Sequence, residues 1–435
     1  MRVAVMGAGR VGVPTAASLA YLGHEVTVVD VDVHKVERLA AGTLPFHERG
    51  LEELARDVMA QGRLRFTSDP AAAVGGARVA MICVGTPPGP DGAADLSAVD
   101  AAAEAVGRHA AGPLIVVIKS TVPPGTAERV GAILRRTASD GAFSVVSNPE
   151  FLREGKAVED SLAPMRILVG TDSADGVAAL RELYAPLVHD GVPLLETDPR
   201  TAEVAKYACN AFLALKVSYV NALARVCEAV GADVEMVTRA MAADDRIGSR
   251  YLSAGLGYGG YCLPKDVEAF ARAAADAGYD FGLLHEVQRA NREAVDAAFA
   301  RVLEVLGDPA GARVALLGLS FKPGTDNVTA SPALSLARRL LDAGARVSGY
   351  DPQAGGNAKS ELPGLEVTGD PYAALEDARC AVLCTDWEEF LALDLDRARE
   401  AMAAPAMVDA RNALNGEDLL RAGFRYIPTG RPAPS

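Results

Sequence analysis

The hydrophobic positions up to Val169 come in short runs that are separated by stretches with helical spacing. Short apolar runs predict strands, and intervening helices make successive strands parallel. The predicted strands cover residues 2–6, 25–29, 78–84, 114–119, 144–147 and 167–169. Strands that alternate with helices in this way form a doubly wound α/β sheet with right-handed crossovers.

The pattern then changes to continuous helix. No glycine or internal proline interrupts residues 201–230, where apolar residues recur at helical spacing, and Gly231 fits a helix end. After further helix comes a glycine-rich segment, residues 255–260, and helical segments are expected again over residues 266–306. This part predicts a helical middle domain built around one long central helix.

A second α/β region follows the helical part. Its predicted strands cover residues 313–318, 346–350, 381–384 and 407–409. The predicted fold is therefore α/β, with two Rossmann-like doubly wound domains (residues 1–197 and 307–430) joined by a helical domain (residues 198–306). The Pro/Gly/Ser-rich end from Gly430, taken as residues 431–435 in this division, predicts a disordered tail.

Length and charge narrow the class of protein. The chain has 435 residues, which indicates two or three domains, and its net charge is −14. A broadly acidic surface argues against nucleic acid or an anionic membrane as a partner, and no apolar run is long enough to span a bilayer. The amino terminus lacks a signal-peptide pattern, and the six scattered cysteines form no CxxC pair. We therefore expect a reduced, cytoplasmic protein.

The first predicted strand leads into a dinucleotide-binding motif. Gly7, Gly9 and Gly12 fit G-x-G-x-x-G, which allows a tight turn and a close approach of pyrophosphate to a helix start. Asp30 follows the next strand, where a carboxylate bonds ribose hydroxyls and repels a 2′-phosphate, so NAD is favoured over NADP. The plain alternatives are a glycine-rich turn without a ligand and, for Asp30, a helix cap or a solvated acid.

The most informative run for chemistry is residues 259–266, Gly-Gly-Tyr-Cys-Leu-Pro-Lys-Asp. Two glycines leave Cys262 open to a ligand, Lys265 could favour the nucleophilic thiolate, and Asp266 could handle protons. An arbitrary cysteine is more often a small buried apolar residue. That interpretation is assigned to Cys83, Cys209, Cys227, Cys380 and Cys384.

Other polar residues also suit catalysis. Lys206 and Asn210 are four residues apart on the predicted long helix, so both can donate to one oxyanion. Glu150 lies just beyond a strand, where such sheets bind ligands, and could activate water with help from Thr121. The alternatives are a solvated lysine, an ordinary polar helix residue and a helix-start carboxylate.

These motifs together resemble the UDP-glucose/GDP-mannose dehydrogenase family, and the resemblance spans nearly the whole chain. The run around Cys262 is similar to the active-cysteine motif of that family, in particular of members that act on UDP-glucose. Further matching motifs lie at residues 84–87, 119–126, 148–155, 203–212, 245–248 and 318–326.

The resemblance implies a four-electron oxidation of a sugar CH₂OH group, at C6 of UDP-glucose, to the carboxylate of UDP-glucuronate with two successive NAD⁺ molecules. In the roles it implies, Cys262 is the nucleophile that forms a thiohemiacetal and then a thioester. Lys206 and Asn210 stabilise the oxyanion, and Asp266 acts on water with Glu150 and Thr121.

The resemblance also implies contact residues. For NAD these are Gly7, Gly9, Val11, Gly12, Asp30, Lys35, Thr86, Thr121, Glu154 and Lys265. For the nucleotide sugar they are Phe151, Leu152, Arg153, Lys206, Asn210, Arg246, Tyr251, Gly259, Phe321, Lys322 and Arg411. Arg246 is expected to reach the substrate across the interface of a homodimer formed through the central helix, and no metal is expected.

One departure bears on the substrate. The family pattern places an arginine where this chain has Thr329, so a charged contact near the nucleotide is missing or supplied elsewhere. UDP-glucose is the first expectation, with dTDP-glucose, GDP-mannose or a UDP-N-acetylhexosamine as alternatives. Two other classes stay open: a two-electron β-hydroxyacid dehydrogenase, which needs neither Cys262 nor a second nucleotide domain, and a non-catalytic NAD-binding regulator.

Overall fold

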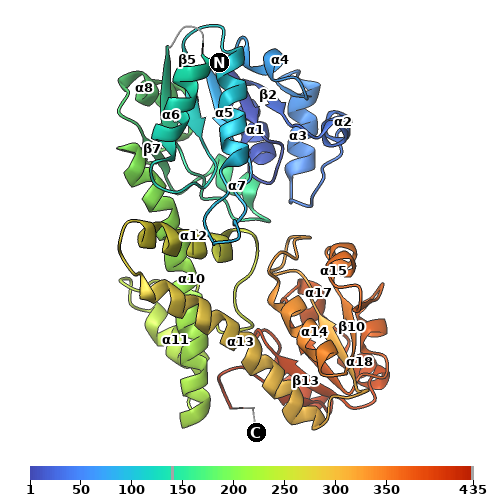
Figure 1. Ribbon diagram of the computed structural model, residues 1–435. Coiled ribbons are helices and arrows are strands. Elements are labelled where there is room, and N and C mark those ends of the chain that lie inside the picture. Colours follow the sequence, from blue (N-terminus) through green and yellow to red (C-terminus); the bar gives the residue numbers. More distant parts are fainter. Residues whose placement is uncertain (139–141, 433–435) are drawn as a thin grey trace. The chain divides into compact units, whose positions relative to one another are not determined.

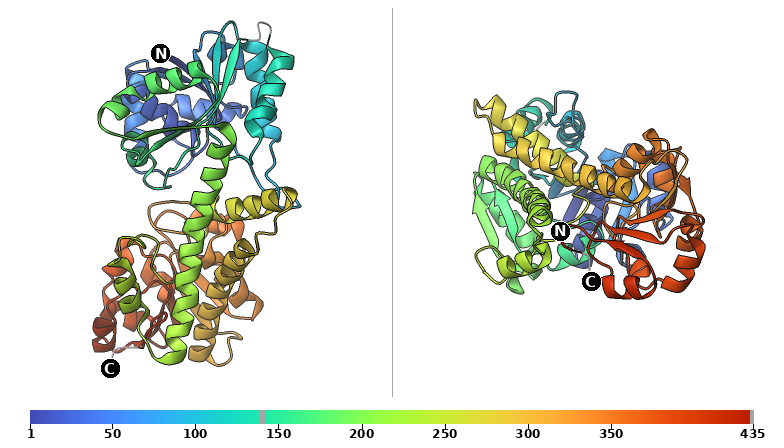
Figure 2. Two further views of the ribbon diagram at one scale, coloured as in Figure 1. Left: turned by 90° about the vertical axis from the view of Figure 1, so that its left-hand side faces the viewer. Right: turned by 90° about the horizontal axis from the view of Figure 1, so that it is seen from below.

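The computed structural model describes residues 1–138 and 142–432, and the chain divides into two compact units (Figure 1). The first unit is Met1–Cys209 with Glu268–Gly278, and the second is Asn210–Val267 with the chain from Tyr279 onward. The division passes through helices α10 (Pro199–Val230) and α12 (Cys262–Asp276). Figure 2 shows α10, in green, as one uninterrupted helix, as its sequence predicts. The division into three domains stays a prediction.

Within the described residues, the first unit contains an eight-stranded sheet in the order β3-β2-β1-β4-β5-β6-β7-β8. Its strands are β1 (Arg2–Met6), β2 (Glu25–Val29), β3 (Leu64–Thr67), β4 (Val79–Ile82), β5 (Leu114–Ile118), β6 (Phe143–Ser147), β7 (Ile167–Gly170) and β8 (Leu194–Thr197). The strands pair in parallel except for β6 with β7, which is antiparallel. The carboxyl ends of β4, β5 and β6 therefore lie at one edge of the sheet.

Helices cover both faces of this sheet because successive residues of a strand point to opposite sides. Val3 and Val5 pack in a core with α1, whereas Ala4 and Met6 pack in a second core with α5 and α6. The helices of this unit are α1 (Gly12–Tyr21), α2 (Val33–Ala40), α3 (Leu51–Ala60), α4 (Pro70–Val74), α5 (Ser97–His109), α6 (Thr126–Thr137), α7 (Ala157–Leu162), α8 (Ala174–Leu183) and α9 (Ala185–His189). The doubly wound fold predicted from the sequence is confirmed.

The second unit contains an all-parallel six-stranded sheet, in the order β11-β10-β9-β12-β13-β14, within the described residues. Its strands are β9 (Arg313–Leu317), β10 (Arg346–Tyr350), β11 (Glu366–Val367), β12 (Cys380–Leu383), β13 (Ala406–Asp409) and β14 (Arg425–Ile427). Its remaining helices are α11 (Val234–Ala242), α13 (Gly282–Leu306), α14 (Pro332–Asp342), α15 (Gly355–Glu361), α16 (Pro371–Leu375), α17 (Glu388–Leu391), α18 (Leu395–Ala401) and α19 (Gly416–Arg421). The predicted second Rossmann-like domain is confirmed.

Two boundaries differ from the sequence-based expectation. The helical part expected from Asp266 is two helices, and the first of them already begins at Cys262, so the thiol lies at a helix start. The tail expected to be disordered from Gly430 is packed at its beginning. The amide of Gly430 donates to Glu228 at 2.8 Å, and Arg431 forms an ion pair with Glu235 at 2.5 Å. Residues 433–435 lie outside the described residues.

Among the described residues, no helix is both long and apolar enough to cross a membrane.

Candidate functional site

The three glycines of the motif lie in the turn between β1 and α1, and their surroundings differ. Gly7 has a φ of +107°, and a Cβ there would come 2.9 Å from the carbonyl oxygen of Cys83. A Cβ on Gly12 would overlap the carbonyl of Gly7. A Cβ on Gly9 would have nothing within 4 Å. Protein packing therefore requires Gly7 and Gly12, whereas Gly9 leaves open space at the start of a helix.

Asp30, just after β2, is held in one orientation. Its Oδ2 accepts from the amide of Ala8 at 2.8 Å, its Oδ1 accepts from the amide of Asp32 at 3.0 Å, and Lys35 Nζ lies 3.1 Å from both oxygens. Burial alone would raise the pKa of Asp30, but the two amides and Lys35 outweigh it and hold that pKa below its ordinary value. An ionised carboxylate beside the glycine turn suits a ribose diol, so Gly9, Val11, Asp30 and Lys35 fit a bound NAD.

The other predicted cofactor residues of the first unit follow its parallel strands. Thr86 lies beyond β4 and donates through Oγ1 to the carbonyl of Thr121, beyond β5, at 2.8 Å. Glu154 forms an ion pair with Arg10, inside the glycine motif, at 2.8 Å. These two contacts bring residues from β1, β4, β5 and β6 to the carboxyl edge of the sheet, where such folds bind ligands.

A buried ion pair joins Glu150 to α10. Glu150 Oε1 lies 3.0 Å from Lys206 Nζ, and the two side chains are 5% and 4% exposed. Burial would raise the pKa of Glu150, but Lys206, the amide of Leu152 and Lys119 outweigh it, so the pKa lies below its ordinary value and the carboxylate stays charged. Lys206 also lines a small hollow with Thr121, so the structure brings these three predicted catalytic residues together.

The segment after Glu150 is held by residues that sequence reasoning missed. Glu48 accepts from the amides of Gly155 and Ala157 at 2.8 and 2.9 Å, and Asp160 binds the guanidinium and the amide of Arg153. Glu48 lies more than a hundred positions earlier in the chain, and nothing in its local sequence indicates such a contact.

A second group of predicted catalytic residues lies in the second unit. Asp266 is fully buried and accepts from Asn210 Nδ2 and from Lys265 Nζ, both at 2.6 Å. Cys262 is exposed and is the first residue of α12, where the partial positive charge of a helix start favours an anion. An exposed thiol and a buried carboxylate are thus placed on the first turns of one helix.

The other five cysteines are buried or partly buried. Burial raises the pKa of Cys83, Cys380 and Cys384 to about 12, so these thiols stay protonated. Cys227 is also buried, and Cys209 is partly buried. Cys262 is the exposed one among the six, all of which lie in the described part of the chain.

The glycine-rich segment before Cys262 packs against the loop after β9. A Cβ on Gly260, whose φ is +82°, would come 2.8 Å from the ring of Phe321, and a Cβ on Gly259 would overlap the carbonyl of Ala330. The guanidinium of Arg411 donates to the carbonyls of Cys384 at 2.7 Å and Phe321 at 3.2 Å. The structure thus places the predicted substrate residues Gly259, Phe321 and Arg411 together.

The loop after β9 resembles the glycine turn after β1: it has a glycine with positive φ, and an aspartate after the next strand accepts from its amides. Gly318 has a φ of +92°, and Asp351, just after β10, accepts from the amides of Leu319 and Ser320 at 2.8 and 2.9 Å. Its Oδ2 also accepts from the indole of Trp387 at 3.1 Å. Its other oxygen, Oδ1, accepts from the amides of Gln353 and Ala354 at 3.0 and 2.8 Å, so Asp351 has more protein donors than Asp30.

Three further predicted substrate residues lie in the second unit. Lys322 Nζ lies 5.4 Å from the ring centroid of Phe321. Arg246 is 89% exposed and pairs with Asp244 at 2.6 Å, and Tyr251 has a left-handed φ of 63°. Two groups of predicted catalytic residues thus belong to different units. The first unit contains Glu150, Thr121 and Lys206, and the second contains Asn210, Cys262, Lys265 and Asp266.

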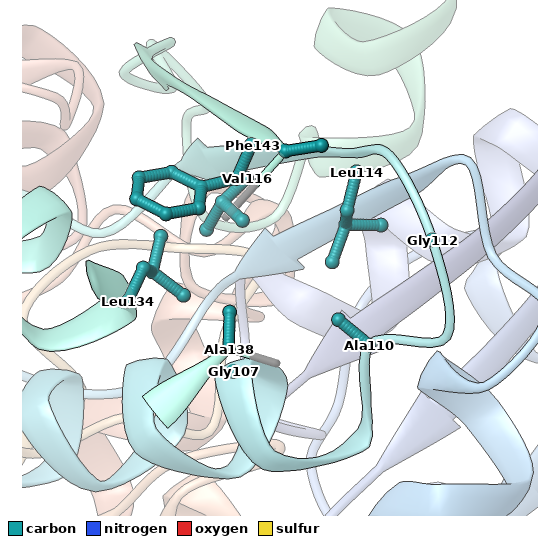
Figure 3. Close-up of a pocket in the computed structure, with 9 residues that line it drawn as sticks. Gly107, Ala110, Gly112, Leu114, Val116, Leu134, Ala138 and Phe143 are labelled. Atoms are coloured by element: carbon teal, nitrogen blue, oxygen red, sulfur yellow. The ribbon is translucent and has the colours of Figure 1, made fainter. Parts of the chain in front are cut away.

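Another hollow in the first unit has a different character. Figure 3 shows it lined by glycine and apolar side chains at the amino ends of β5 and β6, the edge opposite to Thr121 and Glu150. It offers no polar group for chemistry. Within the described residues, no group of three or more His, Cys, Asp or Glu side chains is placed to hold a metal ion.

Three family models match this chain in order. The NAD-binding domain of the UDP-glucose/GDP-mannose dehydrogenase family matches residues 1–188, its central domain matches residues 200–293, and its UDP-binding domain matches residues 315–416. The chain belongs to the UDP-glucose/GDP-mannose dehydrogenase family.

Relatives of known name agree with this membership. A UDP-glucose 6-dehydrogenase of Rhizobium meliloti is 44% identical over 99% of this chain and all of its own length. A UDP-glucose dehydrogenase structure from Pyrobaculum islandicum superposes with a TM-score of 0.93 at 39% identity, covering 99% of this chain and 98% of that one. The structure of a UDP-D-ManNAc dehydrogenase from Pyrococcus horikoshii superposes with a TM-score of 0.86 at 27% identity, with 99% of each chain covered.

Membership in the family decides several predictions. The chain is an NAD-dependent oxidoreductase with a nucleotide-sugar-binding domain, which confirms the predicted class of enzyme, its cofactor and its kind of substrate. The simpler β-hydroxyacid dehydrogenase and the non-catalytic regulator are not favoured.

Thr329, where this chain departs from the family pattern, contacts the glycine-rich segment before Cys262. The side chain of Thr329 is exposed, and its carbonyl accepts from the amide of Gly260 at 2.9 Å. The backbone contact requires no particular side chain, so it does not replace the arginine of the family pattern.

Proposed function

We propose that this enzyme oxidises the C6 hydroxymethyl group of UDP-glucose to a carboxylate and releases UDP-glucuronate. The observation that carries the proposal is Cys262, an exposed thiol at the start of a helix, followed within one turn by the buried Asp266. A two-electron dehydrogenase needs no such nucleophile. The similarity to named UDP-glucose 6-dehydrogenases over the full chain supports UDP-glucose as the substrate.

Two oxidations and one hydrolysis make up the proposed reaction. NAD⁺ held at Gly9, Val11, Asp30 and Lys35 would supply the hydride acceptor for each oxidation, so two equivalents would be used. The CH₂OH group first loses a hydride and a proton and becomes an aldehyde. The sulfur of Cys262 then bonds to the aldehyde carbon, and the thiohemiacetal loses a second hydride and proton to give a thioester.

Hydrolysis then frees the product. Water adds to the thioester carbonyl, gives its proton to a carboxylate, and the carbon–sulfur bond breaks, which returns the thiol and leaves the uronate. Lys206 and Asn210, one turn apart on α10, are proposed to donate to the oxyanion at each stage. Glu150 and Asp266, helped by Thr121, are proposed to orient and deprotonate water. The charged state of Glu150 supports this role because only the carboxylate accepts a proton.

Substrate contacts are proposed for the segment after Glu150 and for the second unit. Phe151, Leu152 and Arg153 would contact the sugar end. Lys322 and Arg411, which both contact Phe321, offer cationic groups for a diphosphate. The enzyme is proposed to work in the cytoplasm, a reducing compartment in which cysteine thiols stay reduced.

We also propose a homodimer formed through α10. Phe212, Tyr219 and Val226 are spaced by seven residues, so they lie along one face of the helix, and they are 60%, 55% and 56% exposed. Exposed large apolar residues in a row mark an interaction surface. A second copy of the chain would cover this row and would allow Arg246 of the partner to reach the substrate.

The test of the function is the amount of NADH formed per nucleotide sugar consumed, across UDP-, dTDP- and GDP-linked sugars. A ratio of two with UDP-glucose, lost in Cys262→Ser, is expected. A ratio of two with another sugar would reassign the substrate and leave the chemistry in place. A ratio of one with free aldehyde, or full uronate formation by Cys262→Ser, would overturn covalent catalysis.

A further inference from the structure

A stacked guanidinium lies beside the segment that carries Glu150. Arg166, the residue before β7, has its guanidinium carbon 3.8 Å from the centroid of the Phe151 ring. Its Nη2 donates to the sulfur of Cys209, on α10, at 3.3 Å. Neither of these partners is a carboxylate. Arg166 therefore binds a ring and a thiol and so joins three separate parts of the first unit.

The same ring has a second cation nearby. Lys206 Nζ lies 5.3 Å from the Phe151 centroid and 3.0 Å from Glu150 Oε1. A cation over an aromatic face is attracted by the ring, more strongly as the pair is removed from water. Phe151 is thus the point at which β7, α10 and the loop after β6 meet.

The position of Phe151 along its loop makes this contact specific for Glu150. The far end of the loop has its own anchors, because Arg153 is bound by Asp160 and Gly155 by Glu48. At the near end, Glu150 Oε2 accepts from the amide of Leu152 at 2.5 Å, across Phe151. A shift of the Phe151 side chain would turn the two peptides that flank it and would move the carboxylate of Glu150.

We infer that Arg166 is a positioning residue: by stacking on Phe151 it places the Glu150 carboxylate for the attack of water on the thioester. The inference rests on the proposed function of Glu150. Hydrolysis depends on the position of Glu150, whereas the two hydride transfers do not, so loss of the stack should slow one step selectively. An error of about 1 Å in the position of a catalytic group can cost up to about a hundredfold in rate.

The test combines rapid mixing with intact-protein mass spectrometry. Arg166→Gln, Arg166→Lys and wild type are mixed with NAD⁺ and UDP-glucose. In Arg166→Gln we expect the first turnover to form NADH at the wild-type rate, steady-state kcat to fall about tenfold, and a thioester adduct on Cys262 to accumulate. Arg166→Lys keeps a cation and should recover most of kcat. Arg181→Gln, an exposed arginine of the same unit that pairs with Glu196, is the matched control and should behave as wild type.

A double-mutant cycle separates positioning from a general loss of structure. Phe151→Leu should produce the same adduct, and Arg166→Gln/Phe151→Leu should be no slower than the slower single variant, because both changes break one contact. NAD⁺ affinity and melting temperature should stay within the range of the Arg181→Gln control. Effects that multiply, an unchanged kcat, or slow turnover without adduct would overturn the inference. A wild-type enzyme that makes neither NADH nor adduct would instead refute the proposed function.

Discussion

At the scale of single residues, the three glycines of the first turn separate packing from ligand binding. A Cβ on Gly12 would overlap the carbonyl of Gly7, so no side chain fits there, whereas the space beside Gly9 is open. A sequence motif treats these positions alike, and only the three-dimensional arrangement distinguishes them. The two kinds of glycine should therefore fail in different ways when they are replaced.

Gly9→Ala should leave the free energy of unfolding unchanged or up to about 1 kcal/mol higher, because alanine restricts the unfolded chain. Its methyl group would enter the space expected for the pyrophosphate, so NAD⁺ affinity should fall about tenfold or more. Gly12→Ala should lower the free energy of unfolding by about 1–3 kcal/mol. Calorimetric NAD⁺ titration and urea unfolding check both. Tight NAD⁺ binding by Gly9→Ala would contradict the assignment of the open space.

Asp30 should make the fold sensitive to acid. Its pKa is lower when folded than when unfolded, so its contribution to stability is complete above the unfolded value of about 3.9 and is lost as pH falls through the folded pKa. Asp30→Asn should therefore lose less stability than wild type between about pH 5 and pH 3. Urea unfolding across this range checks it, with the exposed Asp57→Asn as control. If the free energy of unfolding fell with pH equally in Asp30→Asn and in wild type, Asp30 would not be the source of the acid sensitivity.

At the scale of secondary structure, the face of α10 that carries Phe212, Tyr219 and Val226 offers a direct test of the dimer. Tyr219→Asp should weaken self-association at least about tenfold, because it buries a charge in an apolar interface. Sedimentation velocity over a range of concentrations measures this effect. Leu391→Asp, an exposed apolar position in α17, should leave association unchanged. If Tyr219→Asp associates as wild type does, the dimer does not use this face.

The central strands of both sheets could be predicted from the sequence, but the outer strands could not. Strands such as β1 and β9 are flanked on both sides and read as apolar runs. The missed strands, β3, β8, β11 and β14, are two to four residues long, lie at sheet edges or near them, and carry polar residues such as Arg65, Glu196 and Glu366. An edge strand has one neighbour and partial exposure, so it needs fewer apolar residues.

In the candidate site too, some residues can be predicted from the sequence and others cannot. Cys262, Asp30 and the glycine motif carry a local signal, because their chemistry depends on neighbours in sequence. Glu48 and Arg166 act across long sequence separations and occupy ordinary contexts, so no local pattern indicates them. The sequence predicts a helix only from Asp266, four residues after its actual start at Cys262, because Pro264 suggests a break, although a helix tolerates proline in its first turn.

At the scale of the whole molecule, the proposed dimer and the proposed catalytic roles make a joint prediction. Arg246→Ala and Cys262→Ser should each be strongly impaired alone. When the two are coexpressed, random pairing gives heterodimers in which one site combines an intact Cys262 with the partner's Arg246, so about a quarter of wild-type activity should return. Coexpressed Lys206→Ala and Cys262→Ser should show no such recovery, because both residues are proposed to act from one chain. No recovery in the first mixture would remove Arg246 from the partner's site.

The single tryptophan of this chain is Trp387, whose indole donates to Asp351 beside the loop that carries Phe321 and Lys322. Its fluorescence therefore originates in the second unit alone. Unlabelled protein thus carries a built-in optical probe next to the loop proposed to bind the nucleotide sugar, while the nicotinamide cofactor is expected in the other unit. A change in this emission when nucleotide sugar is added would therefore report binding at the second unit, without any turnover.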